Sequence, residues 1–277
     1  MKRNINTNET PFVRYTLITI ALSFIFIVLI VPLFSVFYYA LDKGYEAYIE
    51  SIKDEEALSA IRLTFLTVLF TVPLNLIFGV AASWVIARFE FTGKSLLTSL
   101  IDIPFSVSPI ISGMIYVLLF GAQGLFGEFL ASHDIKIIFA VPGIIIVTIF
   151  VTFPFIAREL IPIMQSIGSE EEEAALILGA SGWQTFWNVT LPNIKWGIIY
   201  GIILCNARAM GEFGAVSVVS GHIRGLTNTI PLHVEILYNE YNYVGAFAVA
   251  SLLTLAALAT LVIKEIVNYL SHKAGKE

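Results

Sequence analysis

A polar stretch, SEEEEAALILGASGWQTFWNVTLPN at residues 169–193, lies between long apolar segments and decides how the fold is interpreted. Ser169 and Glu172 have the spacing of a capping box, and four consecutive glutamates follow Ser169, where the dipole of a helix favours negative charge. A helix is therefore predicted to begin at Ser169. Gly179 suits the left-handed turn that closes such a helix.

A second short helix is predicted directly after this glycine. Ser181 and Gln184 have the spacing of another capping box, and Pro192 is expected to stop the helix near Leu191. The stretch therefore predicts two short helices joined by a turn and lying against one face of the membrane.

Outward from this stretch, the chain consists of apolar windows bounded by charges. A helix crosses a bilayer with about 20 apolar residues, because the hydrocarbon is roughly 30 Å thick and each residue rises about 1.5 Å. Backbone groups in hydrocarbon must bond within their own helix, so helices are the expected form. Six windows are long enough: residues 15–41, 63–87, 103–127, 137–157, 196–220 and 241–263. The sequence predicts an all-α membrane protein with six transmembrane helices over residues 15–263.

The composition supports a place in the bilayer and excludes several classes of protein. Of the 277 residues 57% are hydrophobic and 13% are charged, whereas soluble proteins average about 25% charged residues. The net charge of −5 argues against binding to nucleic acid. The single cysteine, Cys205, cannot form an internal disulfide, and the four histidines show no zinc-ligand spacing. No metal site is expected.

Positive charges between the windows predict the orientation. With six spans both termini lie on one side, which carries ten Lys and Arg residues, while the other side carries five. The positive-inside rule places the richer side in the cytoplasm. Residues 1–14 and 264–277 are then cytoplasmic ends, residues 158–195 form a cytoplasmic loop, and residues 42–61 face outward.

Uncharged polar groups inside the windows have two interpretations. Asn75 lies in the second window, and Ser106 and Ser108 lie in the run DIPFSVSPIISG at residues 102–113. Such groups either hydrogen-bond between packed helices or line a pathway through the membrane. The sequence leaves both interpretations open.

Arg208 and Glu212 are opposite charges inside the fifth window, four residues apart. Charges at such depth are costly in lipid, so both side chains are expected to face protein or water. One interpretation is a structural ion pair. In the other, Arg208 lies beside the pathway of an anion and Glu212 prevents tight capture. The structural pair is the preferred interpretation.

Neither an ATPase site nor a catalytic constellation is evident. The triplet Gly93-Lys94-Ser95 resembles the end of a phosphate-binding loop, but Arg88 stands where the first glycine is required. No histidine falls within a span, and Cys205 has apolar neighbours and no evident base. The chain is expected to be neither an enzyme nor the holder of a cofactor.

The polar stretch also carries a resemblance to a known family. Its pattern is Glu173-Ala174-Ala175, three residues, Gly179, nine residues, and then Val189-x-Leu191-Pro192. This is similar to the EAA loop of permease subunits of ABC importers, with Val189 in place of the usual Ile. The resemblance implies the MetI-like permease fold. It also implies a coupling helix that docks into a cytoplasmic ATPase through Glu173, Ala174, Ala175 and Gly179, with Leu191 and Pro192 completing the motif.

Longer segments resemble the W-type membrane subunits of sulfate and thiosulfate importers: residues 102–113, 148–164, 178–194 and 206–225. This resemblance implies a T-type sister permease, two copies of a separate ATPase that uses ATP and Mg²⁺, and an extracytoplasmic sulfate-binding protein. The location it implies is a bacterial plasma membrane. Molybdate permeases share the EFGA stretch at residues 212–215, so a molybdate or tungstate permease remains an alternative.

Two further classes of protein fit the sequence less well. An ion-coupled secondary transporter explains polar groups within spans, but it gives no role to the pattern at residues 169–192, and the sequence shows no internal hydropathy repeat. A membrane enzyme lacks a nucleophile paired with a base. The ABC importer permease is therefore the preferred prediction.

Overall fold

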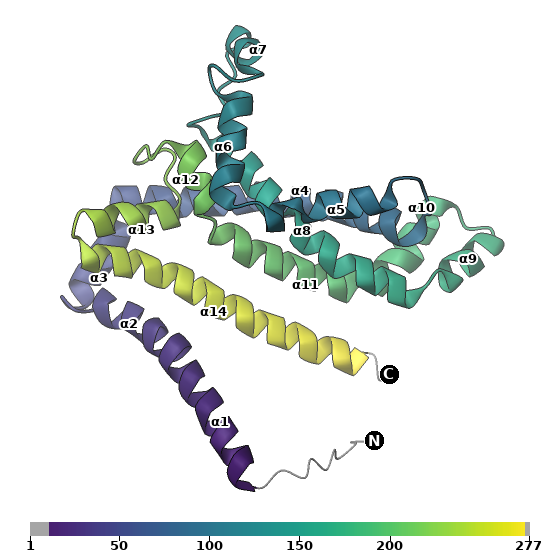
Figure 1. Ribbon diagram of the computed structural model, residues 1–277, viewed down its shortest axis with the longest axis horizontal. Coiled ribbons are helices and arrows are strands. Elements are labelled where there is room, and N and C mark those ends of the chain that lie inside the picture. Colours follow the sequence, from purple (N-terminus) through teal and green to yellow (C-terminus); the bar gives the residue numbers. More distant parts are fainter. Residues whose placement is uncertain (1–10, 275–277) are drawn as a thin grey trace.

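The computed structural model describes residues 11–274, with side chains described as far as residue 270, and within that range every regular element is a helix. Four long helices form the bundle: α4 (Glu55–Arg88), α8 (Val141–Ile167), α11 (Leu191–Met210) and α14 (Tyr243–Ala274). They run side by side, with α8 packed between α4 and α11 (Figure 1). The prediction of an all-helical protein is confirmed for the described residues.

Close packing of the bundle centre depends on two glycines that face one isoleucine. A Cβ atom at Gly79 of α4 would lie 2.8 Å from Cγ2 of Ile156, and one at Gly201 of α11 would lie 3.4 Å from the Cα of Ile156. Ile156 of α8 is fully buried between these helices. Small residues at such crossings let helices in a membrane approach each other closely.

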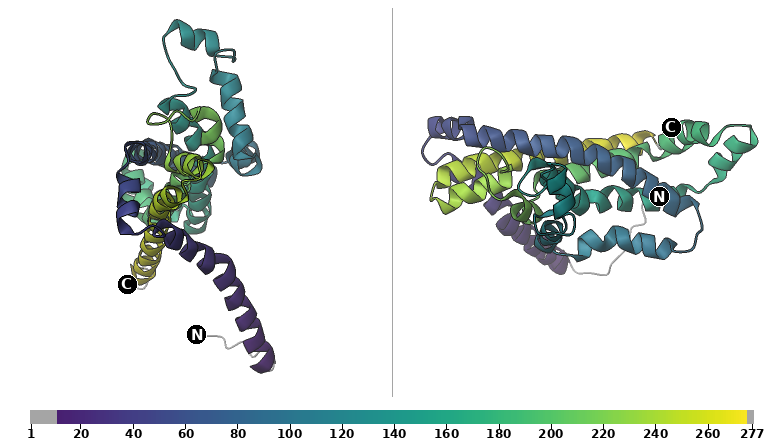
Figure 2. Two further views of the ribbon diagram at one scale, coloured as in Figure 1. Left: turned by 90° about the vertical axis from the view of Figure 1, so that its left-hand side faces the viewer. Right: turned by 90° about the horizontal axis from the view of Figure 1, so that it is seen from above.

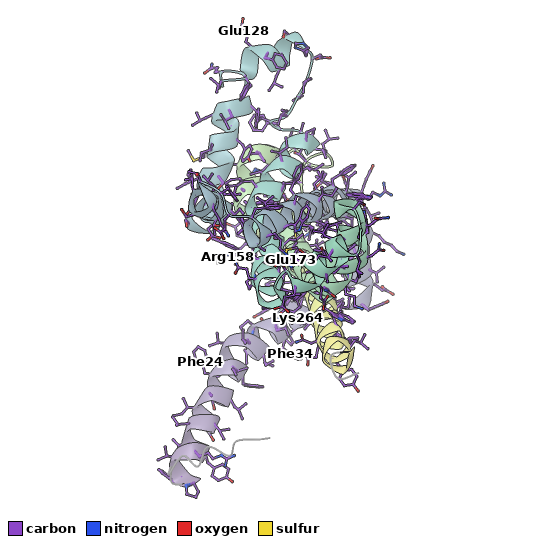
Figure 3. All side chains as sticks on the ribbon, turned by 90° about the vertical axis from the view of Figure 1, so that its right-hand side faces the viewer. Phe24, Phe34, Glu128, Arg158, Glu173 and Lys264 are labelled. Atoms are coloured by element: carbon purple, nitrogen blue, oxygen red, sulfur yellow. The ribbon has the colours of Figure 1, made fainter. Side chains whose placement is uncertain are left out.

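The first predicted span leaves the bundle at its N-terminal part, whereas its last helix packs against α14. It consists of α1 (Pro11–Ile25), a single π-helical segment η1 (Phe26–Ile30) and α2 (Val31–Ala40), and its most apolar window buries none of its residues within the chain. Figure 2 shows it splayed away on the opposite side from α6 and α7. The side chain of Phe24 stands free of the bundle (Figure 3), and Phe34 of α2 is mostly exposed.

A second π-helical segment corrects the expected stop at Pro192. The helix α10 (Gly182–Thr185) continues through η2 (Phe186–Thr190) into α11, and Pro192 lies inside this continuous helical run. The N–H group of Leu191 bonds to the carbonyl of Phe186, which widens the turn ahead of the proline. A widened turn accommodates the proline ring and its missing N–H group, so the helix does not end there.

Two of the predicted spans are broken rather than straight. The third comprises α5 (Lys94–Ser106) and α6 (Pro109–Phe120), which meet at 107°, and the fifth comprises α11 and α12 (Gly214–Ser220), which meet at 52°. Ser108 has an extended backbone because a proline follows it. Within residues 11–274, four helices are long and apolar enough to cross a membrane alone, and the number rises to six if each bent pair counts as one span.

Short helices cover both ends of the bundle. The elements α3 (Tyr45–Lys53) and α13 (Ile230–Asn239) lie at one end, α9 (Glu170–Ile177) and α10 lie at the other, and α7 (Gly127–Ser132) caps the projecting α6 (Figure 1). The predicted loop from residue 158 begins only after Ile167, where α8 ends. The predicted tail from residue 264 continues α14 to Ala274, whereas residues 1–10 and 275–277 of the predicted ends lie outside the described residues.

Candidate functional site

The predicted pair of short helices forms a hairpin at one end of the bundle, made of α9 and α10. Gly179 joins them with a φ of +92°, so the predicted left-handed turn is confirmed. The second capping box is also confirmed, since the Gln184 N–H donates to Ser181 Oγ over 3.3 Å and the Ser181 N–H donates to Gln184 Oε1 over 2.8 Å.

The first capping box is wrong. Ser169 precedes α9, but its side chain makes no cap bond, and its hydroxyl donates to Glu173 Oε1 at 2.6 Å instead. Its backbone is close to helical, whereas a capping residue needs an extended one. Glu172, the expected partner of Ser169, is occupied elsewhere.

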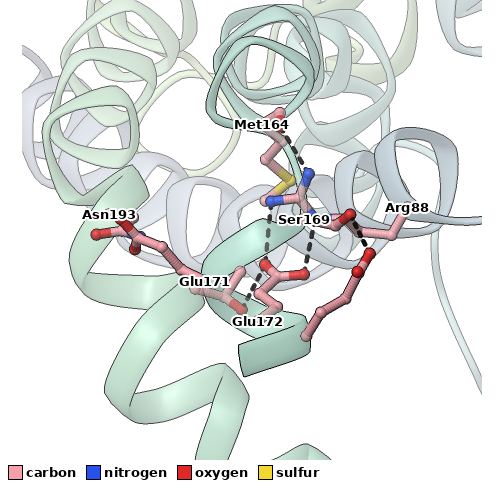
Figure 4. Close-up of polar contacts among 8 residues, drawn as sticks. Arg88, Met164, Ser169, Glu171, Glu172 and Asn193 are labelled. Atoms are coloured by element: carbon pink, nitrogen blue, oxygen red, sulfur yellow. Dashed lines mark hydrogen bonds and ion pairs between the residues drawn. The ribbon is translucent and has the colours of Figure 1, made fainter. Parts of the chain in front are cut away.

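An arginine at the end of α4 holds Glu172. Arg88 Nε lies 2.8 Å from Glu172 Oε2, and Arg88 Nη2 donates to Glu172 Oε1 over 3.0 Å (Figure 4). The pair is largely enclosed, with exposed side-chain fractions of 9% for Arg88 and 15% for Glu172. Arg88 Nη1 also donates to the carbonyl of Met164, in the last turn of α8, over 2.7 Å. One guanidinium therefore ties the hairpin to the ends of two bundle helices.

Two further contacts connect the hairpin to the start of α11. Thr190 Oγ1 donates to Glu172 Oε1 over 2.8 Å, and Asn193 Nδ2 donates to Glu171 Oε2 (Figure 4). The sequence pattern indicated a capping role for Glu172 and no partner for Arg88. The connection could not be predicted because 84 residues separate the two partners of the ion pair.

The end of the hairpin exposes apolar side chains. Ile177 and Leu178 are almost fully exposed, and Trp183 is mostly exposed, beside the exposed Glu173 and Ala174. We call this surface the hairpin tip. Large apolar side chains gathered in one exposed place are typical of a protein contact.

The remaining motif residues lie behind the tip. Ala175 is half-buried, and Leu191 and Pro192 lie at the base of α11, where Leu191 closes the π-helical turn. The structure therefore separates the motif into a part on the hairpin, which includes Glu173, Ala174 and Gly179, and a part at the base of α11, where Pro192 is exposed as well.

The uncharged pathway candidates lie in two different environments. Asn75 is fully buried in the bundle, where its amide donates to Thr152 Oγ1 over 2.8 Å and to Cys205 Sγ over 3.6 Å. These bonds connect α4, α8 and α11, so the geometry favours the packing interpretation for Asn75. Ser106 and Ser108 are exposed at the break between α5 and α6.

Arg208 and Glu212 form an ion pair at the second break. Arg208 Nη1 lies 2.6 Å from Glu212 Oε2, and the exposed side-chain fractions are 33% and 1%. Glu212 follows the end of α11, and its Oε1 accepts a hydrogen bond from the N–H group of Ala215 in the first turn of α12 over 3.0 Å. Glu212 therefore also satisfies a backbone N–H group at the start of α12, a role that the sequence pattern did not indicate.

No group of three or more His, Cys, Asp or Glu side chains among the described residues is placed to hold a metal ion.

Comparisons with known proteins extend over the whole bundle. Residues 75–273 match the family described as binding-protein-dependent transport system inner membrane component. The chain is 52% identical over 272 residues to the sulfate transport system permease protein CysW of Synechocystis, covering 98% of this chain and 99% of that protein. It is 33% identical over 241 residues to the permease protein CysT of Escherichia coli K12, covering 87% of each.

A solved structure shares the fold. The bacterial alginate ABC transporter in complex with an alginate-bound periplasmic protein contains a chain that superposes with a TM-score of 0.77 at 16% identity, covering 95% of both chains. At this identity the likeness concerns the fold alone.

Proposed function

Because the chain belongs to the family of binding-protein-dependent transport system inner membrane components, we propose that it forms half of the translocation pathway of a sulfate importer. It is the permease component of an ABC transporter and a multi-pass inner membrane protein. The observation that carries the proposed substrate is the 52% identity to a sulfate permease along 98% of the chain. Thiosulfate, as a similar dianion, belongs to the same proposal.

The other half of the pathway is a sister permease. The similarity to both CysW and CysT proteins supports a pair of related but different membrane subunits. An extracytoplasmic sulfate-binding protein delivers the anion, and two copies of a cytoplasmic ATPase use ATP and Mg²⁺. The MetI-like fold gives this chain the membrane role within that assembly.

The hairpin tip is the proposed docking site for the ATPase. Glu173, Ala174 and Gly179 are exposed there, and Ala175 allows close approach of the partner. Leu191 and Pro192 hold the base of the hairpin at α11, while Arg88 and Glu172 connect it to the bundle. Movement of the ATPase would thus reach α4, α8 and α11 together.

Deletion of this chain in a host without another sulfate importer is expected to impose a requirement for a reduced sulfur source such as cysteine. The reason is that such a cell has no other route for taking up sulfate and therefore cannot reduce it to make cysteine. Growth on sulfate and uptake of radioactive sulfate measure the effect, and restoration by the gene in trans is the control. Normal growth on sulfate combined with loss of molybdoenzyme activity would move the substrate to molybdate or tungstate.

We also propose that both termini and the hairpin lie in the cytoplasm, since nine positive residues against five favour that side even when Arg158, which lies within α8, is left out. Single cysteines at the exposed Lys53 and Gln165 test this in a Cys205→Ala background. On intact cells a membrane-impermeant thiol reagent should label position 53 strongly and position 165 only after permeabilisation. The reverse pattern would invert the orientation.

A further inference from the structure

An exposed ion pair joins α5 and α8 within the membrane-spanning part of the chain. Arg158 Nε donates to Asp102 Oδ1 over 2.8 Å, and Arg158 Nη2 donates to Asp102 Oδ2 over 3.2 Å. The guanidinium also lies 4.9 Å from the ring centroid of Phe105. The exposed side-chain fractions are 58% for Arg158 and 35% for Asp102, and Figure 3 shows Arg158 at the edge of the bundle.

The depth of this ion pair in the membrane can be estimated from the hydrogen bond between Asn75 and Thr152. Asn75 is at the centre of the charge-free window 63–87, and its bond to Thr152 places Thr152 at the same level. Arg158 lies six residues further along α8 towards the hairpin, or about 9 Å at 1.5 Å per residue. Half the hydrocarbon thickness is about 15 Å. The backbone of Arg158 is therefore inside the hydrocarbon region, in its inner half.

Hydrocarbon is an unfavourable neighbour for this pair. A charged side chain that faces hydrocarbon is costly, and charged side chains within spans face water or protein almost without exception. Both partners are well exposed in the single chain, so the neighbour lies outside it. Water in a pathway and a sister subunit are the two possible neighbours.

The surface of α5 favours water. Polar residues recur every four positions along this helix, at Lys94, Thr98, Asp102 and Ser106, and they form a stripe that winds slowly around it. Leu96, Leu100 and Ile103 are also exposed, and they supply an apolar surface suited to lipid. We call the four polar residues, Lys94 to Ser106, the α5 polar stripe. It ends at the break between α5 and α6, where Ser106 is exposed.

A hollow of about 330 Å³ lies beside the ion pair, and its lining combines the two helices: Thr98, Ile101, Asp102, Arg158, Ile161 and Pro162. Asp102 accepts hydrogen bonds from Nε and Nη2 of Arg158. Nη1 of Arg158 makes no hydrogen bond to any of the described residues. A fork of donors therefore remains for a passing oxyanion.

We propose that Arg158 contacts the transported anion in the inner half of the pathway, with Asp102 as its positioning residue. The inference rests on the proposed function, and it adds a residue that determines passage of a tetrahedral dianion. Asp102 orients the guanidinium and offsets its charge, so the anion can accept hydrogen bonds from Arg158 without being bound tightly. A pathway needs contacts that are favourable enough for entry and weak enough for release.

Transport by the complete complex in proteoliposomes tests the role of charge. Arg158→Gln should leave assembly and binding-protein-stimulated ATP hydrolysis within twofold of wild type but lower sulfate uptake at least tenfold. The double change Arg158→Gln with Asp102→Asn leaves no unpaired charge, and its uptake should stay equally low. Asp102→Asn alone should lower the KM for uptake and also the maximal rate. Arg14→Gln, on the splayed α1, is the matched control and should transport normally.

Recovery of uptake in the double variant would overturn the proposal, because it would make the pair a structural contact with the sister subunit. Sulfate uptake by wild type is measured first. If wild type carries another oxyanion instead, the proposed substrate fails, and the same Arg158 comparison is made with the anion that is carried.

Water access provides an independent measurement. In a Cys205→Ala background of the assembled complex, Ser106→Cys on the polar stripe should react with a small water-soluble thiol reagent. Leu100→Cys, also exposed on α5, should not react because it faces lipid. Equal protection of both cysteines would place the stripe in a dry subunit interface and contradict the pathway role.

Discussion

Replacement of Arg88 by methionine is expected to abolish coupled uptake while the permease still inserts into the membrane. The change leaves Glu172 enclosed without its cation, and breaking one side of such a buried pair costs about 3–5 kcal/mol. It also removes the donor to the Met164 carbonyl, so the hairpin loses its connections to α4 and α8 together. Insertion depends on the apolar spans, which the substitution does not change.

Pull-down of the ATPase with a tagged permease and uptake of sulfate measure this effect, and both should fall at least tenfold. Glu172→Gln should have a similar effect, because the amide cannot neutralise Arg88. Glu170→Gln is the matched control: it removes a charge from the same run of glutamates at an exposed position and should stay within twofold of wild type. Wild-type ATPase retention in Arg88→Met would show that the hairpin is held without this pair.

The second large effect concerns Glu212. Arg208→Met should reduce the amount of assembled complex severely, since it leaves a carboxylate that is 1% exposed without its partner. The cost is near the lower end for a buried pair, about 3 kcal/mol, because Arg208 itself is one-third exposed. Adding Glu212→Gln should restore assembly. The amide oxygen can still accept the N–H group of Ala215, while no charge remains.

Uptake by this double variant separates the two interpretations of Arg208. We expect uptake to recover along with assembly, as a structural pair requires. An assembled complex that hydrolyses ATP but moves little anion would instead make Arg208 a pathway residue. A simple exchange of the two charges is less informative, because arginine at position 212 cannot accept the hydrogen bond that serves the start of α12.

Features that depend on neighbouring residues could be predicted from the sequence. Gly179 was predicted to adopt a left-handed conformation because the residues before it form a helix, and Ser181 with Gln184 forms a cap three positions apart. The membrane class followed from the apolar windows, because hydrocarbon imposes a helix on any long apolar segment. The motif at residues 173–192 indicated the family for a similar reason, since its residues lie close together in the chain.

Tertiary structure decided the features that depend on a distant partner. Ser169 and Glu172 have a capping spacing, but Glu172 pairs with Arg88, which offers a charge-assisted hydrogen bond and an ion-pair contact where a cap offers one hydrogen bond. Pro192 lies within a helix because the preceding turn widens, and this helical run then packs against α8. The pairing of Arg158 with Asp102 spans 56 residues of sequence. Local sequence determines backbone conformation, whereas the partner of a charge inside the membrane is determined by which helices pack together.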